Sequence, residues 1–195
     1  GNIYHGTDFK LDLTPPYGSP PDFHAISKLS SEGVLCLFSD CLGAETPGLT
    51  LSESAVGESF ENEIKNTPGK FIMTTFSSNI SRIRQCIESS VKYQRKIVFL
   101  GRSMKENTNI AREIGYLPFK NNLFVDDRTL RKTPPNKLTL IVAGSQGQIN
   151  SALTKLATDQ NVNIKIGKGD KVVFSSDPIP GNEAEVYKLI EKLMI

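Results

Sequence analysis

The sequence predicts an α/β domain of three layers, in which helices cover both faces of a mainly parallel sheet. Two observations predict this class. Apolar runs that continue without alternation recur along the chain, as strands buried on both faces do. Stretches of helical periodicity separate most of these runs, which is the order expected of strand–helix–strand crossovers. A turn-rich segment of different character precedes this pattern.

The predicted strands are continuous runs rich in Val, Ile, Leu and Phe. A further run, "LFVDD" at 123–127, is a weaker candidate for a short strand. The five main runs are 33–40, 70–76, 96–101, 137–144 and 171–176.

The predicted helices rest on apolar side chains at helical spacing. One short helix is expected at 22–30 and a longer one at about 53–66. Three further stripes are Ile80, Ile83, Ile87 and Val91; Ala152, Leu153, Leu156 and Ala157; and Val186, Leu189, Ile190 and Leu193.

The first part of the chain is interrupted by the turn signals "TPP" and "SPP" and offers little regular structure. We therefore place a domain boundary between residues 47 and 48. Residues 1–47 are expected to be part of one domain, and residues 48–195 a second, α/β domain.

Composition narrows the setting. The chain has 195 residues, 38% hydrophobic and 23% charged, which describes an ordinary globular protein. A net charge of +2 is too small to indicate nucleic-acid binding by itself, so any such site must be a local patch. The three cysteines form no CxxC pair, which favours a reduced, cytoplasmic protein. The sequence has no apolar run of the length a membrane helix needs, so a membrane role is not expected.

Polar loops, three of them with glycine, follow four of the strands: "TTFSSN", "GRSM", "AGSQGQ" and "FSSDPIPGN". In an open parallel sheet these loops meet at the carboxyl edge, where hydroxyls, backbone N–H groups and helix N-termini can bind an anion. The alternative is plain helix capping, since Ser103 with Glu106 and Asn182 with Glu185 have capping-box spacing. The candidate anion-binding residues are Ser77, Ser78, Arg102, Ser103, Ser145, Gln146, Ser175, Ser176, Gly181 and Asn182.

Several standard motifs are absent. The sequence has no G-x-G-x-x-G after a strand, no G-x-x-x-x-G-K-[ST] and no G-x-S-x-G. His5 and His24 are its only histidines, which argues against a Ser-His-Asp site and against a self-contained zinc site.

Read together, "HGTDFKLDLTPP", "GVLCLFSD", "AETPGLTLSE", "TTFSSNISRI", "GRSMKEN", "AGSQGQ" and "VVFSSDPIPGNE" resemble bacterial ribonuclease J, a β-CASP family of the metallo-β-lactamase superfamily. The resemblance covers essentially the whole chain. It implies a cytoplasmic enzyme that hydrolyses single-stranded RNA, as a 5′-to-3′ exonuclease and an endonuclease, in RNA turnover and rRNA maturation. It leaves self-association of the full-length protein open.

The resemblance also implies which parts of the site this chain supplies. Residues 1–47 would be a segment of the metallo-β-lactamase domain, and residues 48–195 the β-CASP domain with the RNA-phosphate-binding loops. The family's H-x-H-x-D-H motif is expected before residue 1 and its other histidines after residue 195. Two zinc ions would be bound by the full-length enzyme, Asp8 matching the metal-bridging aspartate and Asp40 an aspartate that supports a zinc-binding histidine. The isolated chain is expected to bind no zinc and to be inactive.

Departures from the family pattern keep other interpretations open. The chain has Gly6-Thr7 where the family has Thr-Gly, "SDCLGAE" for S-D-S-T-N-A-E, and "AGSQGQ" for T-G-S-Q-G-E. A non-catalytic RNA-binding paralogue is therefore one alternative. A domain that binds a nucleotide or sugar phosphate is a weaker one.

Overall fold

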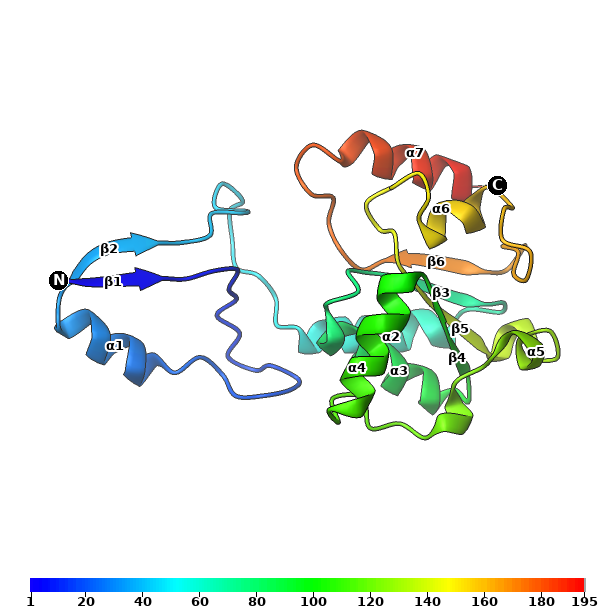
Figure 1. Ribbon diagram of the computed structural model, residues 1–195, viewed down its shortest axis with the longest axis horizontal. Coiled ribbons are helices and arrows are strands. Elements are labelled where there is room, and N and C mark those ends of the chain that lie inside the picture. The colour runs from blue at the N-terminus through cyan, green and yellow to red at the C-terminus, as the bar shows by residue number, and fades with distance from the viewer. Residues whose placement is uncertain (195) are drawn as a thin grey trace. The chain divides into compact units, whose positions relative to one another are not determined.

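The computed structural model describes residues 1–194, apart from the side chains of Asp127 and Arg128. The chain divides into two compact units, Gly1–Val56 and Gly57–Ile195, each described here by itself (Figure 1). The division between the two units, after Val56, falls within helix α2 (Ser54–Lys65). The predicted domain boundary between residues 47 and 48 stays a prediction.

The first unit is a two-stranded parallel sheet with one helix. Strand β1 (Asn2–His5) pairs with β2 (Val34–Phe38), and α1 (Phe23–Ser31) connects them. Asp22 begins α1 by accepting a hydrogen bond from the backbone N–H of Ala25, at 2.9 Å. Apolar side chains of both strands remain exposed, which leaves this unit with little core of its own.

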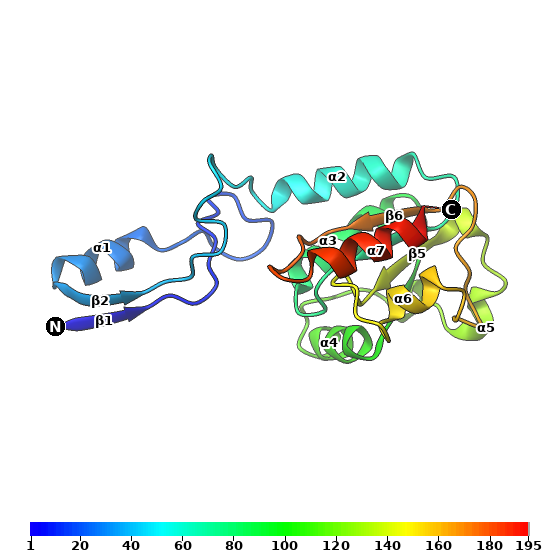
Figure 2. The same cartoon turned by 90° about the horizontal axis from the view of Figure 1, so that it is seen from above.

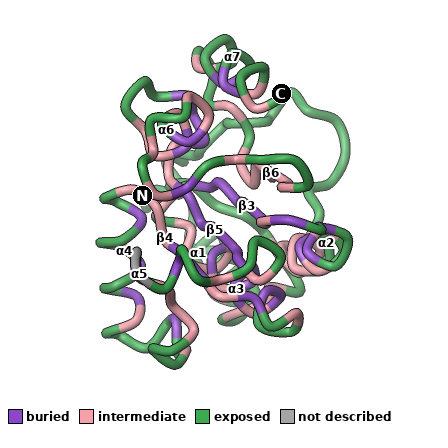
Figure 3. The backbone as a smooth tube through the Cα atoms, turned by 90° about the vertical axis from the view of Figure 1, so that its right-hand side faces the viewer, coloured by how far each residue is buried: buried purple, intermediate pink, exposed green. Residues whose placement is uncertain are grey.

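The second unit is built on a four-stranded sheet, and it confirms the predicted α/β class. Its strands lie in the order β4-β5-β3-β6, and every neighbouring pair is parallel. The strands are β3 (Phe71–Thr74), β4 (Lys96–Leu100), β5 (Leu138–Val142) and β6 (Lys171–Phe174). The two inner strands, β3 and β5, are buried along their whole length (Figure 3).

Helices form the outer layers of this unit. Figure 2 shows α2 on one side of the sheet and α6 on the other. No helix of residues 1–194 has both the length and the apolarity needed to cross a membrane. The remaining helices are α3 (Ile80–Lys92), α4 (Arg102–Glu113), α5 (Asp127–Leu130), α6 (Ala152–Ala157) and α7 (Glu183–Leu193), with 3₁₀ turns η1 (Asn121–Leu123) and η2 (Pro135–Lys137).

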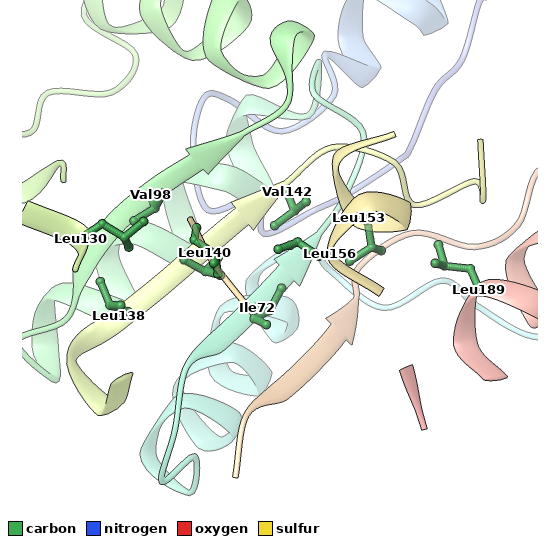
Figure 4. Close-up of a cluster of buried hydrophobic side chains, with 10 residues drawn as sticks. Ile72, Val98, Leu130, Leu138, Leu140, Val142, Leu153, Leu156 and Leu189 are labelled. Carbon is green, nitrogen blue, oxygen red and sulfur yellow. The ribbon is translucent and has the colours of Figure 1, made fainter. Parts of the chain in front are cut away.

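Alternate residues of each strand serve the two faces of the sheet. On one face, a buried cluster joins the strands to α6 and α7 (Figure 4). On the other face, Phe71 of β3 meets Phe60 of α2 edge to face, with ring centroids 6.4 Å apart. The cluster in Figure 4 contains Ile72, Val98, Leu130, Leu138, Leu140, Val142, Leu153, Leu156, Ile164 and Leu189.

A buried arginine forms hydrogen bonds with several segments at the end of the sheet that lies opposite the strand-end loops. Arg95, at 3% exposure, precedes β4, and its hydrogen bonds to the described residues all go to backbone carbonyls. Burial lowers the pKa of Arg95. Its guanidinium reaches the carbonyls of Thr67 at 2.6 Å, Gly69 at 2.9 Å, Leu138 at 3.0 Å and Ile64 at 3.4 Å.

The short strand predicted at 123–127 is wrong. Only Phe124 pairs with the sheet, through one parallel bridge to Ile97, after the 3₁₀ turn η1. The Phe124 ring stacks on Phe99 and lies under Arg112, so packing at the sheet edge explains the apolar character of this run. Helix α5 begins at Asp127, with the Asp126 carboxylate as its cap.

Candidate nucleic-acid interface

All four polar loops lie at one edge of the sheet. Because β3, β4, β5 and β6 are parallel neighbours, their carboxyl ends point the same way. The loops are residues 75–79 (the β3–α3 loop), Gly101 (the β4–α4 junction), 143–151 (the β5–α6 loop) and 175–182 (the β6–α7 loop).

The β6–α7 loop is fastened at its start to the end of β3. The carbonyl of Ser175 accepts hydrogen bonds from Thr75 Oγ1 at 3.1 Å and from Arg82 Nη1 at 2.6 Å. The N–H of Ser175 donates to the carbonyl of Thr74 at 2.8 Å. Asn79 caps α3 by accepting from the N–H of Arg82, which helps to place the arginine at this edge.

The middle of the β6–α7 loop is held by the β5–α6 loop. Gln146 Nε2 donates to the carbonyl of Asp177 at 3.0 Å, and the N–H of Ile179 donates to Gln146 Oε1 at 2.7 Å. Gln146 is 4% exposed, and Ser145 beside it is 3% exposed. The predicted phosphate contact of the Gln146 side chain would therefore compete with two existing hydrogen bonds inside the protein.

Ser176 is also turned inward. Its hydroxyl oxygen is buried and has no hydrogen-bond partner among the described residues. A phosphate could reach this hydroxyl only after the loop moved, so the structure does not present Ser176 Oγ as a surface donor. Gly181 is exposed and Asn182 half-buried, and these two residues remain accessible.

The β4–α4 junction opens onto a different hollow. Gly101 has φ +105°, and Cβ at this position would lie 2.8 Å from Cβ of Ala143, so glycine allows this close approach. Arg102 and Ser103 are exposed and line a pocket of about 910 Å³, together with Lys105 and Lys155. The pocket also contains Gly144 but none of the predicted residues of the β6–α7 loop. The predicted phosphate-binding residues Arg102 and Ser103 are thus separate from those of the β6–α7 loop.

Sequence reasoning missed the two lysines of this pocket. Lys105 lies three residues after Arg102 on α4, a spacing that places both on one helix face. Lys155 lies on α6. The helical spacing of Arg102 and Lys105 is a signal that could have revealed the first lysine, whereas Lys155 becomes a neighbour only through the fold.

The alternative of capping boxes is wrong for both helices. Helix α4 begins at Arg102 with Gly101 as N-cap and no side-chain cap, so Ser103 lies inside the helix. Asn182 is the N-cap of α7, but its side chain makes no capping hydrogen bond. Instead, Glu183 Oε2 accepts a hydrogen bond from the N–H of Gly181, at 2.8 Å.

The β3–α3 loop contributes Ser77 and Ser78. Asn107 Nδ2 of α4 donates to Ser77 Oγ at 3.1 Å, which leaves this half-buried hydroxyl free to donate elsewhere. Ser78 is exposed and lies on the rim of a pocket of about 370 Å³ between α3 and α4, beside Asn107 and Tyr116.

The first unit holds the two aspartates proposed for metal chemistry. Asp8 is exposed, and Asp40 is exposed with its Oδ1 accepting from the N–H of Leu42 at 3.0 Å. Within the described part of the chain, no three His, Cys, Asp or Glu residues are grouped as metal ligands would be. These residues alone do not fit a zinc pair, which needs several ligands around each ion.

Comparisons with known proteins identify the family. Residues 68–193 match the family model described as "Ribonuclease J, beta-CASP domain". The chain is 40% identical over 194 residues to ribonuclease J of Helicobacter pylori strain J99, covering 100% of the chain and 28% of that protein. It is 37% identical over 195 residues to ribonuclease J of Synechocystis, covering 100% of the chain and 30% of that protein. It is 39% identical over 193 residues to ribonuclease J of Thermus thermophilus, covering 99% of the chain and 34% of that protein. The chain therefore spans about a third of the length of these relatives, and it belongs to the ribonuclease J family, with the β-CASP domain at residues 68–193.

Proposed function

We propose that this chain is the RNA-binding β-CASP side of a zinc-dependent ribonuclease. The whole protein would act on single-stranded RNA as a 5′-to-3′ exonuclease and an endonuclease, in RNA turnover and rRNA maturation, and in the cytoplasm. Two zinc ions would be bound mainly by residues outside this chain. Asp8 would be the ligand that this chain contributes, and Asp40 would support a zinc-binding histidine. Family membership supports this proposal.

The observation that carries the proposal is the gathering of four polar strand-end loops at one edge of a fully parallel sheet. Near that edge, Arg102, Lys105 and Lys155 line one pocket with a single carboxylate, Glu106. An excess of cations beside backbone N–H groups suits a polyanion such as RNA. The alternative of a non-catalytic RNA-binding paralogue shares this surface, so RNA binding is the property to test first.

The test replaces Arg102 with Ala and compares it with Lys168→Ala. Lys168 is exposed and precedes β6, at the opposite edge of the sheet, so its loss removes the same charge away from the loops. Binding of a labelled single-stranded oligoribonucleotide with a 5′-monophosphate would be measured by fluorescence anisotropy at several salt concentrations. A mononucleotide competitor would show whether a small nucleotide is preferred instead.

We expect Arg102→Ala to weaken binding about tenfold and to reduce the slope of log affinity against log salt by about 1, because one phosphate contact and its released counterion are lost. Lys168→Ala should leave both values close to those of the unmodified chain. Equal effects of the two substitutions would show that the loop edge is not the RNA site. Displacement of the oligonucleotide by equimolar mononucleotide would favour the nucleotide-binding alternative.

A further inference from the structure

We propose that Gln146 is a positioning residue that holds the β6–α7 loop in the conformation needed to bind RNA phosphate. The effect on RNA rests on the proposed function, whereas the effect on the loop does not. Gln146 would act through the backbone of residues 177–179 and would not itself contact RNA.

The orientation of the Gln146 amide is fixed by its partners. The backbone N–H of Ile179 can only donate, so the atom facing it must be the amide oxygen, at 2.7 Å. The carbonyl of Asp177 can only accept, so the atom facing it must be the amide nitrogen, at 3.0 Å. A planar group with one donor and one acceptor side by side is therefore required at this position.

The loop cannot satisfy these two groups by itself in the usual way. Pro178 lies between Asp177 and Ile179 and has no N–H, so this turn offers one fewer donor of its own. Pro180, three residues after Asp177, also has no N–H, so the usual turn hydrogen bond to the carbonyl of Asp177 cannot form. Gln146 thus fixes the segment that leads directly into the exposed Gly181 and the N-cap Asn182.

The segment around Gln146 is closely packed. Gln146 is 4% exposed, and Gly147 follows it with φ +73°. A Cβ atom on Gly147 would lie 2.6 Å from the backbone of Glu185, so the loop packs directly against the first turn of α7. The β5–α6 loop therefore contacts both the β6–α7 loop and the helix that this loop begins.

The sharpest test is Gln146→Glu, which keeps the shape and changes one atom. When ionised, the introduced carboxylate has no donor for the carbonyl of Asp177 and places a buried negative charge beside that carbonyl. The pKa of the introduced carboxyl should therefore lie above that of an ordinary glutamate. When protonated, its O–H can donate to Asp177 while its carbonyl oxygen accepts from Ile179. The pair of hydrogen bonds that residue 146 makes with Asp177 and Ile179 is called the clamp below. In Gln146→Glu the clamp should be broken at neutral pH and restored by acid.

Two further variants keep the test interpretable. Gln148→Glu makes the same chemical change two residues away at an exposed position and should leave the protection of the Ile179 amide unchanged. Because Gln148 lines the same pocket as Arg102, this variant is a control for the loop and not for RNA binding. Gln146→Met keeps the length of the side chain and removes both hydrogen-bonding atoms, so its loss of the clamp should not depend on pH. Circular dichroism would establish that each variant is folded.

The readout is the protection factor of the Ile179 amide in hydrogen exchange, which corrects for the intrinsic effect of pH. For Gln146→Glu we expect protection to fall about tenfold at pH 8 and to recover at about pH 5, with the pH of recovery reporting the raised pKa. Gln146→Met should lose protection at both values. Unchanged protection at pH 8, or lost protection that acid does not restore, would overturn the clamp.

The proposed effect on RNA binding is tested separately from the effect on the loop. The affinity of each variant for the same oligonucleotide is divided by the affinity of the unmodified chain at the same pH. We expect the ratio for Gln146→Glu to be reduced about tenfold at pH 8 and to approach one at about pH 5. An altered loop with unchanged RNA affinity would overturn the role in RNA binding and leave the clamp. If the unmodified chain binds no RNA at all, both the proposed function and the proposed effect of Gln146 on RNA binding fail. The exchange data still show whether the clamp exists.

Discussion

Ser176 has a buried hydroxyl that finds no hydrogen-bond partner among the described residues. An unsatisfied buried polar group of this kind costs about 1–3 kcal/mol. The hydroxyl of its neighbour Ser175 is not among these buried, unpartnered groups, and the Ser175 backbone bonds to Thr74 of β3 and to Thr75 after it. Two adjacent serines in "FSSDPIPGN" are therefore unequal in their surroundings, although the sequence treats them alike.

Replacing Ser176 with Ala should not destabilise the chain. We expect the free energy of unfolding to stay the same or to rise by up to about 1 kcal/mol, because no hydrogen bond is lost and a desolvation penalty is removed. RNA affinity should change less than about twofold, since the buried oxygen is not offered to solvent. Urea denaturation and oligonucleotide titration would check both, with the unmodified chain as the reference. Marked loss of RNA affinity in a stable variant would show that the loop opens to expose Ser176.

At the residue scale, the sequence predicts the exposed loop residues better than the buried ones. Arg102 and Ser103 are accessible at the strand-end edge, as a local reading of "GRSM" suggests. The contact of Gln146 with Asp177 joins residues 31 apart, and no local pattern encodes it. Whether a polar side chain in a loop faces solvent or another loop depends on how the loops pack, which only the fold determines.

At the element scale, strands buried on both faces are the most predictable parts. The four runs of the second unit became β3, β4, β5 and β6 because each is continuous and apolar. Helix α4 lacks the apolar stripe from which a helix can be predicted. Its buried residues are Met104, Thr108 and Ala111, of which one is polar and one small. Strand β1 has four residues in a turn-rich segment, and parallel pairing with β2 is what makes it a strand.

The buried guanidinium of Arg95 connects several elements and should be important for their stability. Arg95→Met removes the donor for the carbonyls of Gly69, Thr67 and Leu138 and leaves them buried. Each unsatisfied group costs about 1–3 kcal/mol, so we expect a loss of about 3 kcal/mol or more in the free energy of unfolding.

Chemical denaturation would measure this loss, with Lys96→Met as the matched control. Lys96 is the next residue; it is half-buried and donates one solvent-exposed hydrogen bond, to the carbonyl of Asn122. Its replacement should cost less than about 1 kcal/mol. Similar losses for the two variants would mean that the Arg95 bonds add little beyond side-chain packing.

At the scale of the whole molecule, the gathering of the four loops follows from topology. Parallel strands place their carboxyl ends together whatever the loop sequences are, so polar loops after several strands predict a shared edge. Topology does not decide which loops share a pocket. Arg102 and Ser103 face the large pocket with Lys155, whereas the β6–α7 loop is fastened to Gln146 and Arg82.

The chain as it stands should bind RNA without cleaving it. Asp8 is the one residue proposed as a zinc ligand, it is exposed, and the described residues contain no cluster of three potential ligands. A single carboxylate cannot hold two zinc ions against water. Purified chain would be incubated with 5′-monophosphorylated RNA and zinc or manganese, and the products separated on a denaturing gel.

We expect intact RNA in every lane, with binding still detectable by anisotropy in the same samples. Asp8→Asn serves as the control, because a contaminating nuclease would be unaffected by this substitution. Cleavage that a chelator blocks, that survives repurification and that Asp8→Asn abolishes would show that the chain assembles a metal site by itself. Such a site would have to recruit ligands beyond those that the fold groups together, for example from a second copy of the chain.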